Sequence, residues 1–175
     1  YSLFQLLYGK RDDFEEQLAQ LIKILARNYV QRDQELKELD QERESNHNWF
    51  LDQQWVGMAL YASAFADDLA GLGKRLGYLQ ELGVNLVHVM PVLKCPPGAS
   101  DGGYAVSDFR SIDERVGTLQ DIRALAGKMR KRGMLLTLDV VMNHTSDQHD
   151  WAWKARSGKQ RYQDFYYVYD DREVP

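Results

Sequence analysis

The feature that most constrains the fold is an alternation of helical stretches and apolar strands, in which each helix ends at a glycine. A helix is expected in "LAGLGKRLGYLQELG" and is followed at once by "VNLVHVMPV"; a second helix, "GTLQDIRALAGKMRKRG", is followed by "MLLTLDVVM". The apolar run "VGMALYASAF" precedes both helices. Strands that are apolar on both faces and alternate with helices pair in parallel, with the helices outside. The pattern therefore predicts an α/β unit, and both a barrel and an open doubly wound sheet satisfy it.

Each of the two helices has an apolar stripe at helical spacing. Thr118 and Asp121 have the spacing of a capping box at the start of the second helix. Gly83 and Gly133 are expected to end the two helices. The stripes are predicted to face the sheet and consist of Leu72, Leu76, Leu79 and Leu82 in the first helix and Leu119, Ile122, Leu125 and Met129 in the second.

Residues 1–48 are expected to be helical throughout. In "FEEQLAQLIKILARNYV" the apolar residues recur every three or four positions, and Asp12 or Asp13 is expected to cap the start. A second helix, "RDQELKELDQERES", has only Leu36 and Leu39 as strong apolar anchors and is expected to be mostly solvated. The pair is too short for a coiled coil, so packing on a neighbouring domain is favoured.

Composition excludes several classes of function. The 175 residues carry a formal net charge of -4, and lysine and arginine are scattered, which argues against a nucleic-acid surface. No apolar run approaches the roughly 18 residues of a membrane span. The lone cysteine, Cys95, cannot form an internal disulfide, and it is interpreted as a plain thiol. A bacterial cytoplasmic location is expected; because the chain begins at Tyr1, the native N-terminus is expected to be missing, and secretion stays possible.

Polar residues collect after two of the predicted strands, where parallel α/β folds place their working groups. The loop after the strand at 84–92 presents Asp101, Tyr104 and Asp108. Asp139 lies inside the end of the strand at 134–142, and Asn143, His144, Asp147 and His149 follow it. No phosphate loop and no Gly-x-Ser-x-Gly elbow occur. Carboxylates, histidine and an aromatic ring suit a sugar, whose hydroxyls take hydrogen bonds while an aromatic face covers the ring.

Other residues in these segments have plainer interpretations. His88 lies within a predicted strand and is interpreted as a core histidine with a satisfied hydrogen bond, not as a ligand. A metal cluster of His144, Asp147 and His149 is disfavoured, since the intervening loop fixes no geometry. The aromatic residues between Trp151 and Tyr169 are expected to pack together within their own domain.

Several stretches, in order along the chain, resemble a known family. "SDGGYAVSDF" and "DVVMNHTS" resemble signature regions of the α-amylase superfamily, glycoside hydrolase family 13. With "NWFLDQQWVGMALY", "LQELGVNLVHVMPVLKCPPG", "NHTSDQHDW" and "FYYVYDDREVP", the chain resembles its amylosucrases and sucrose hydrolases. The resemblance implies the front part of a TIM (β/α)8 barrel, strands one to three with their helices, after a small all-helical segment. The implied domains are a helical segment at 1–48, three βα units at 49–143 and the start of an inserted domain at 144–175.

The resemblance also implies roles for single residues. Tyr104 matches the aromatic residue that stacks on the glucosyl ring, and His144 matches the histidine that hydrogen-bonds the 6-hydroxyl of that ring. Asp101 matches a carboxylate that pairs with a distant arginine and closes the pocket floor. Asp139 matches an aspartate that orients its neighbours. Asn143 matches a calcium ligand of typical α-amylases, but the amylosucrase branch usually works without that ion, so no metal or cofactor is expected.

The activity implied is that of a sucrose-acting, α-retaining glucosyl transferase or hydrolase, with sucrose and a glucan acceptor as partners. Its aspartate nucleophile and glutamate acid/base are expected beyond Pro175, so this chain is expected to be an N-terminal fragment that is inactive alone. Self-association through the open barrel edge is a further expectation. Two alternatives stay open: a calcium-dependent α-amylase-type hydrolase, which would use Asn143, and a non-catalytic carbohydrate-binding relative.

Overall fold

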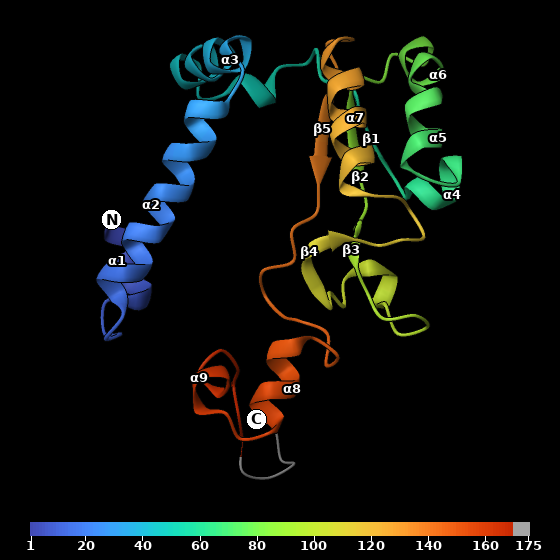
Figure 1. The fold of residues 1–175 in the computed structure, drawn as a ribbon. Coiled ribbons are helices and arrows are strands. Elements are labelled where there is room, and N and C mark those ends of the chain that lie inside the picture. Colours follow the sequence, from blue (N-terminus) through green and yellow to red (C-terminus); the bar gives the residue numbers. More distant parts are fainter. Residues whose placement is uncertain (170–175) are drawn as a thin grey trace. The chain divides into compact units, whose positions relative to one another are not determined.

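The computed structural model describes residues 1–169 and divides into two compact units, Tyr1–Asp52 and Gln53–Pro175. Helices fill the first unit, as predicted, and they are drawn in blue to teal in Figure 1: α1 (Ser2–Tyr8), α2 (Phe14–Gln31), α3 (Gln34–Ser45) and the 3-10 helix η1 (Trp49–Leu51). The domain limits given above, 48/49 and 143/144, stay predictions, and positions 170–175 of the third domain lie outside the described residues.

Within the helical unit, α1 packs on the start of α2. The Phe4 ring lies 5.6 Å from the Phe14 ring, and Phe14 and Leu18 are buried. Asp13 occupies the N-cap position of α2, but its carboxylate accepts hydrogen bonds from Arg11 and Gln17 and caps no backbone amide. The rest of the predicted stripe is exposed, and its packing on a neighbouring domain stays a prediction: Leu21, Ile22, Leu25 and Tyr29.

The second unit is built on a parallel sheet. Strands β1 (Gly57–Leu60), β2 (Leu86–Val89) and β5 (Leu135–Leu138) pair in the order β1-β2-β5, all parallel (Figure 1). This order confirms the pairing predicted from the strand–helix alternation. Each strand is shorter than predicted, with four residues in the parallel ladder. Beyond β2, Pro91 has no amide with which to extend the ladder.

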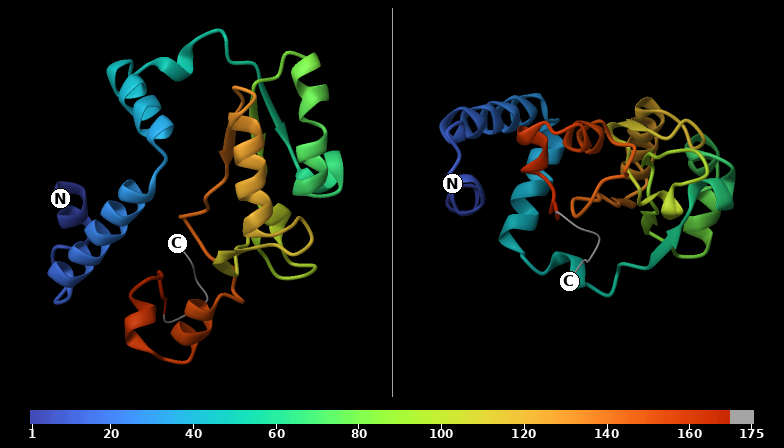
Figure 2. Two further views of the ribbon diagram at one scale, coloured as in Figure 1. Left: turned by 45° about the horizontal axis from the view of Figure 1, so that its top comes forward. Right: turned by 90° about the horizontal axis from the view of Figure 1, so that it is seen from below.

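The two faces of this sheet differ. Val87 and Val89 of β2 are fully buried on the face covered by α5 (Leu69–Lys74), α6 (Leu76–Glu81) and α7 (Leu119–Arg130). Figure 2 shows α7 running alongside β5. The other face carries the registered row Ala59, His88 and Thr137, of which His88 is half-buried and the other two are exposed. Within the described part of this second unit, residues 53–169, helices cover one face of the sheet only.

The first predicted helix is two helices, which meet at Arg75 with φ -92° and ψ 4°. Glycines at 71, 73 and 77 weaken a continuous helix here. The stripe continues across the break, since Leu72, Leu76 and Leu79 are fully buried. Leu82, expected in the core, is 51% exposed because it is the C-cap residue of α6 and lies beyond its last turn. In α7 the capping box of Thr118 and Asp121 is confirmed.

The ends of both helical segments follow the prediction. Gly83 and Gly133 have φ of 81° and 66°, the left-handed conformation that ends a helix with least strain in glycine. The start of α7 does not follow it. Leu119, predicted to lie in the stripe, is 49% exposed, because it is the first residue of the helix and precedes the turn that packs on the sheet.

Two further segments differ from the sequence-based expectation. The run predicted as a strand at 56–65 ends at Leu60 and continues as α4 (Ala62–Ala66), whose two terminal alanines are buried one helical turn apart. Short apolar runs leave strand and helix ambiguous, and alanine favours helix. The expected loop after β2 contains a small antiparallel pair, β3 (Leu93–Lys94) and β4 (Asp108–Ile112), with the 3-10 turn η2 (Asp101–Gly103) between them.

The last described segment holds α8 (Asp150–Arg156) and α9 (Gln160–Gln163). The Trp151 ring lies 4.8 Å from the Phe165 ring, so part of the aromatic set packs together as expected. Tyr167, by contrast, is 95% exposed. Within residues 1–169, none of the helices has the length and apolar character that crossing a bilayer requires.

Candidate functional site

A tyrosine and an aspartate from two loops meet at the carboxyl end of the sheet. Tyr104 lies just after η2, in the loop that follows β2, and Asp139 immediately follows β5. The Tyr104 hydroxyl donates a hydrogen bond of 3.2 Å to Oδ2 of Asp139. The contact joins residues 35 positions apart in sequence. It fixes the position of the Tyr104 hydroxyl, and with it the direction of the ring's long axis, beside a carboxylate, and an aromatic face next to a polar group suits a sugar.

The other oxygen of Asp139 faces β2. Nε2 of His88 lies 3.0 Å from Oδ1 of Asp139, and both side chains are partly buried, with exposed fractions of 34% and 24%. An ionised carboxylate only accepts hydrogen bonds, so Nε2 of His88 carries the proton in this contact. The sequence placed His88 in the core with a satisfied hydrogen bond; the structure gives the bond, but on the open face of the sheet. The neighbouring buried Val87 and Val89 are the signal, since alternate strand residues face opposite sides.

His144 joins the same place from the chain beyond β5. Its Nε2 lies 3.1 Å from the backbone carbonyl oxygen of Tyr104, and its side chain is exposed. Asn143 is also exposed, with Nδ2 3.5 Å from Nδ1 of His144. Four of the residues considered from the sequence, Tyr104, Asp139, Asn143 and His144, are thus brought together.

The electrostatic surroundings of Tyr104 keep its hydroxyl protonated. Burial raises the pKa of the Tyr104 phenol, and the hydrogen bond to Asp139 raises it further, because both disfavour the phenolate. Tyr104 is therefore a neutral hydrogen-bond donor with an apolar ring, and it is suited to contact a sugar and unsuited to act as a nucleophile.

Asp101 stands apart from this cluster. It is exposed, and its φ of 48° lies in the left-handed region that non-glycine residues rarely adopt. Its backbone carbonyl accepts a hydrogen bond from the Tyr104 amide at 3.1 Å, and among residues 1–169 its carboxylate makes no ion pair. Asp101 thus shapes the turn that presents Tyr104, and its expected pairing with a distant arginine stays a prediction.

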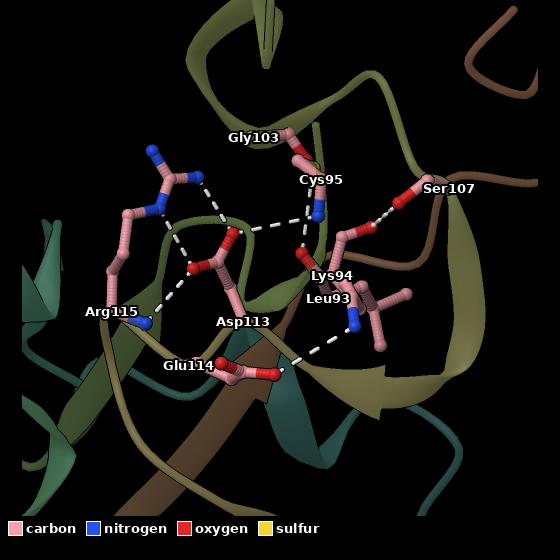
Figure 3. A network of polar contacts seen from close by, with 8 residues as sticks. All are labelled: Leu93, Lys94, Cys95, Gly103, Ser107, Asp113, Glu114 and Arg115. Carbon is pink, nitrogen blue, oxygen red and sulfur yellow. Dashed lines mark hydrogen bonds and ion pairs between the residues drawn. The ribbon is translucent and has the colours of Figure 1, made fainter. Parts of the chain in front are cut away.

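A buried carboxylate holds the loop that carries Tyr104. Figure 3 shows Asp113, 8% exposed, accepting hydrogen bonds of 2.8 and 2.6 Å from the Arg115 guanidinium and a longer one, 3.4 Å, from the Cys95 amide. These hydrogen bonds, that of the Arg115 side chain first, lower the pKa of Asp113. The sequence analysis missed this anchor, because "RSIDERVG" carries no periodic signal.

Cys95 and Gly103 close the same loop from its other side. The Cys95 thiol donates to the carbonyl oxygens of Leu93 and Gly103 at 3.4 and 3.2 Å, and burial raises the pKa of the thiol, which supports its interpretation as an inert group. Gly103 has φ of 96°, and a Cβ there would lie 2.9 Å from Cβ of Pro91. Only glycine lets the loop backbone lie this close to the end of β2.

The second loop is held in part through the first. The Ser146 amide donates to the Val106 carbonyl at 2.8 Å, and the buried His149 ring lies 5.6 Å from the Phe109 ring. Nδ1 of His149 accepts a hydrogen bond from the Trp151 amide at 3.1 Å and so caps α8. Burial lowers the pKa of His149. His149 is therefore a structural residue, and no group of three histidine, cysteine or acidic side chains suited to a metal ion occurs within the described part of the chain.

The last two acidic residues considered from the sequence, Asp108 and Asp147, have local partners. A cavity apart from the cluster of site residues lies in the same unit. Asp108 accepts hydrogen bonds from the Arg110 amide and the Ser111 hydroxyl, and Asp147 forms a long, exposed contact of 3.8 Å with Arg156. A cavity of about 360 Å³ opens beside Tyr61 and Pro91. Neither Tyr104 nor Asp139 lines it, so this cavity is not the place where the predicted site residues meet.

Comparisons with known proteins agree on one family. The model of the alpha-amylase catalytic domain matches residues 26–175. The oligo-1,6-glucosidase of Parageobacillus thermoglucosidasius is 43% identical over 100 residues, which are 57% of this chain and 17% of that protein. Maltase 1 of Drosophila virilis is 34% identical over 91% of this chain and 25% of that protein.

Solved structures point the same way. An isomaltulose synthase mutant of Erwinia rhapontici NX5, in complex with its natural substrate sucrose, matches with a TM-score of 0.62 and 34% identity over 69% of this chain and 22% of that one. The chain thus spans between about a sixth and a quarter of the length of these proteins. It belongs to the α-amylase family, glycoside hydrolase family 13, and its parallel strands with outer helices are the front part of that (β/α)8 barrel.

Proposed function

We propose that the protein carrying this chain acts on a small α-glucoside, with sucrose as its substrate, in the manner of amylosucrases and sucrose hydrolases. In this proposal the chain supplies one wall of the pocket for the glucosyl ring. The observation that carries the proposal is the meeting of Tyr104, Asp139 and His144 at the carboxyl end of the sheet, through the hydrogen bonds at 3.2 and 3.1 Å. In this proposal these groups bind and orient the sugar, and none of them attacks the glycosidic bond or protonates its oxygen.

Each residue has a defined task in this pocket. The Tyr104 ring, whose hydroxyl is held by Asp139, covers the apolar side of the sugar. His144 is exposed beside it and is available to a sugar hydroxyl. A retaining glycosidase further needs a nucleophilic carboxylate and a carboxylic acid about 5–5.5 Å apart, and we place these groups in the part of the protein that follows this chain.

The preference for sucrose rests on the first loop and on the solved structures. Asp101 is exposed on the turn that presents Tyr104, where a carboxylate can pair with an arginine from elsewhere in the protein and limit the pocket to one ring. The isomaltulose synthase of similar fold was solved with sucrose. No metal enters the proposal; a calcium requirement, with Asn143 as a ligand, would instead favour the α-amylase alternative.

A second candidate is hydrolysis of α-1,6-linked glucose oligomers. The similarity to an oligo-1,6-glucosidase at 43% identity over 100 residues supports it. The same pocket wall would serve, since both substrates present a terminal α-glucosyl ring. The two substrates differ in the group that is linked to this ring, and none of the residues described above is proposed to contact that group.

The test uses the full-length protein, purified and supplied separately with sucrose and isomaltose, before and after treatment with a chelator. Turnover of sucrose, unaffected by chelation, is the expected result. Faster turnover of isomaltose would replace the first candidate by the second, and loss of activity on chelation would favour the calcium-dependent alternative. Binding of sugar without any turnover would support the non-catalytic alternative and overturn the proposal.

Variants of the full-length protein test the assigned residues. Tyr104→Ala and His144→Ala should each lower kcat/KM on sucrose, whereas Thr137→Val, on the same face but outside the cluster, should not. Asp101→Ala would leave its arginine unpaired, which costs roughly 3–5 kcal/mol when buried, so a fall of at least about a hundredfold is expected. Near-normal turnover by Asp101→Ala alone would reduce Asp101 to a turn-forming residue and remove the main argument for sucrose.

A further inference from the structure

The open face of the sheet carries a histidine, His88, to which the proposed function assigns no contact with the sugar and no part in cleaving the glycosidic bond. His88 is the middle member of the registered row Ala59–His88–Thr137, and its two neighbours are small. Its side chain is 34% exposed, although β2 is the central strand. A polar side chain at this position of a barrel strand requires a physical reason, because an apolar residue would fill the space without needing a hydrogen-bond partner.

The hydrogen bonds supply that reason. Asp139 accepts from Nε2 of His88 at 3.0 Å with one oxygen and from the Tyr104 hydroxyl at 3.2 Å with the other. The three side chains come from β2, from the loop after it, and from the end of β5. One carboxylate thus joins a strand residue, which the sheet holds in place, to a loop residue, which the sheet does not hold.

We propose that His88 is a positioning residue for the glucosyl site: it holds Asp139, and through Asp139 it sets the position of the Tyr104 hydroxyl and thus the direction of the ring's long axis. Without the His88 contact, the Asp139 side chain is free to rotate about its own bonds, and it then no longer fixes the Tyr104 hydroxyl. Since catalysis depends on the placement of the bound sugar, a shift of about 1 Å in a supporting group can cost up to a hundredfold in rate.

Asp139 alone would not define this geometry. It is the first residue after β5, and of residues 140–142, which follow it, only Val141 is buried, whereas Val140 and Met142 are exposed. His144 cannot substitute for His88, because its Nε2 contacts the Tyr104 backbone carbonyl and leaves the phenol unconstrained. The proposal rests on the proposed function for its effect on turnover, but the contact chain itself does not depend on which sugar is bound.

The test compares three variants of the full-length protein. His88→Leu removes the donor, His88→Gln keeps an N–H at a similar distance from the backbone, and Thr137→Val changes the registered neighbour on the same face without touching Asp139. We expect kcat/KM on the substrate to fall roughly tenfold or more in His88→Leu, to recover largely in His88→Gln, and to stay unchanged in Thr137→Val. In a Tyr104→Phe background, which keeps the ring but lacks the hydroxyl, His88→Leu should cost much less than in the wild-type protein.

A readout that needs no turnover separates this inference from the proposed function. With tyrosine labelled at the ring carbon that bears the hydroxyl, the NMR signal of Tyr104, assigned through Tyr104→Phe, should shift in His88→Leu and not in Thr137→Val. If the wild-type protein turns over no glucoside but the signal shifts as expected, the proposed function fails and the positioning role stands. If the signal of His88→Leu matches the wild type, or if its effect on kcat/KM is the same in the Tyr104→Phe background, the positioning role is overturned.

Discussion

The two loops at the carboxyl end of the sheet are held in different ways. The first loop, residues 93–116, is tied to itself by the β3–β4 pair and by the Asp113 carboxylate, which joins Arg115 to the Cys95 amide. The second loop, residues 139–149, depends on the first loop and on β2: Asp139 contacts Tyr104 and His88, and the Ser146 amide donates to Val106. It also contacts the segment after α9, where the Thr145 and Tyr166 hydroxyls lie 2.8 Å apart. A change in the first loop should therefore disturb both, and a change late in the second should stay local.

The largest effect on stability is expected for Gly103→Ala in the first loop. The alanine would have to keep a left-handed backbone conformation, with its Cβ 2.9 Å from Cβ of Pro91. We therefore expect the unfolding free energy to fall by roughly 2–3 kcal/mol and sugar binding to weaken. Gly98→Ala is the control, since Gly98 also has a positive φ but open space around it. Urea denaturation of both variants gives the comparison, and equal losses would remove the contact with Pro91 as the cause.

The next effect is expected for Asp113→Ala. It leaves the buried Cys95 amide without its acceptor and releases Arg115, which we expect to cost about 1–3 kcal/mol. Glu114→Ala is a matched neighbour: Glu114 is 89% exposed, 3.7 Å from Lys94, and a weak surface pair contributes little. Hydrogen exchange should show faster opening at both loops in Asp113→Ala only. Faster exchange confined to residues 93–116 would contradict the dependence of the second loop on the first.

A smaller, pH-dependent effect is expected at His149. The fold lowers the pKa of His149, so the folded state favours the neutral ring whose Nδ1 caps α8. The stabilisation is present above the ordinary histidine pKa of about 6.5 and is lost as the pH falls from there through the folded-state pKa.

His149→Asn keeps a capping side chain without a titrating group, so it should flatten this part of the curve of unfolding free energy against pH. His149→Ala should cost about 1 kcal/mol at neutral pH through the lost cap. An unchanged pH profile in His149→Asn would show that another group titrates there.

The smallest effect is expected on the exposed surface of α8, the helix that follows the second loop. Lys154 pairs with Asp150 one turn earlier in α8, and the aspartate is well exposed. Lys154→Ala should change the unfolding free energy by only about 0.3–0.5 kcal/mol and leave sugar binding unchanged. Loss of sugar binding in this variant would show that α8 is coupled to the pocket and would break the contrast between the loops.

Repetitive features of the chain were predictable from sequence. The strand–helix alternation gave the parallel pairing of β1, β2 and β5, and the glycines after α6 and α7 gave their ends. Tyr104, Asp139 and His144 were placed at the correct end of the sheet because parallel strands bring their carboxyl ends together. These inferences depend on local periodicity and on one topological rule.

Features that depend on a single tertiary contact were not predictable. β3 spans two residues, Leu93 and Lys94, and carries no alternation to detect. Asp113 anchors its loop through Arg115, two residues away, and through Cys95, 18 residues away, a pairing that spacing does not reveal. For His88 the sequence predicted a satisfied hydrogen bond but not its place on the open face of the sheet. Its partner, Asp139, is 51 residues away in sequence and is brought to it only by the fold.

The most direct test of the proposed glucosyl site is a crystal structure of the full-length protein soaked with glucose. The account predicts one ring stacked on Tyr104, with a hydroxyl within about 3 Å of a nitrogen of His144, while the hydroxyl of Tyr104 stays on Asp139. A glucose bound elsewhere, with Tyr104 and His144 uncontacted at a concentration that saturates binding in solution, would contradict the account.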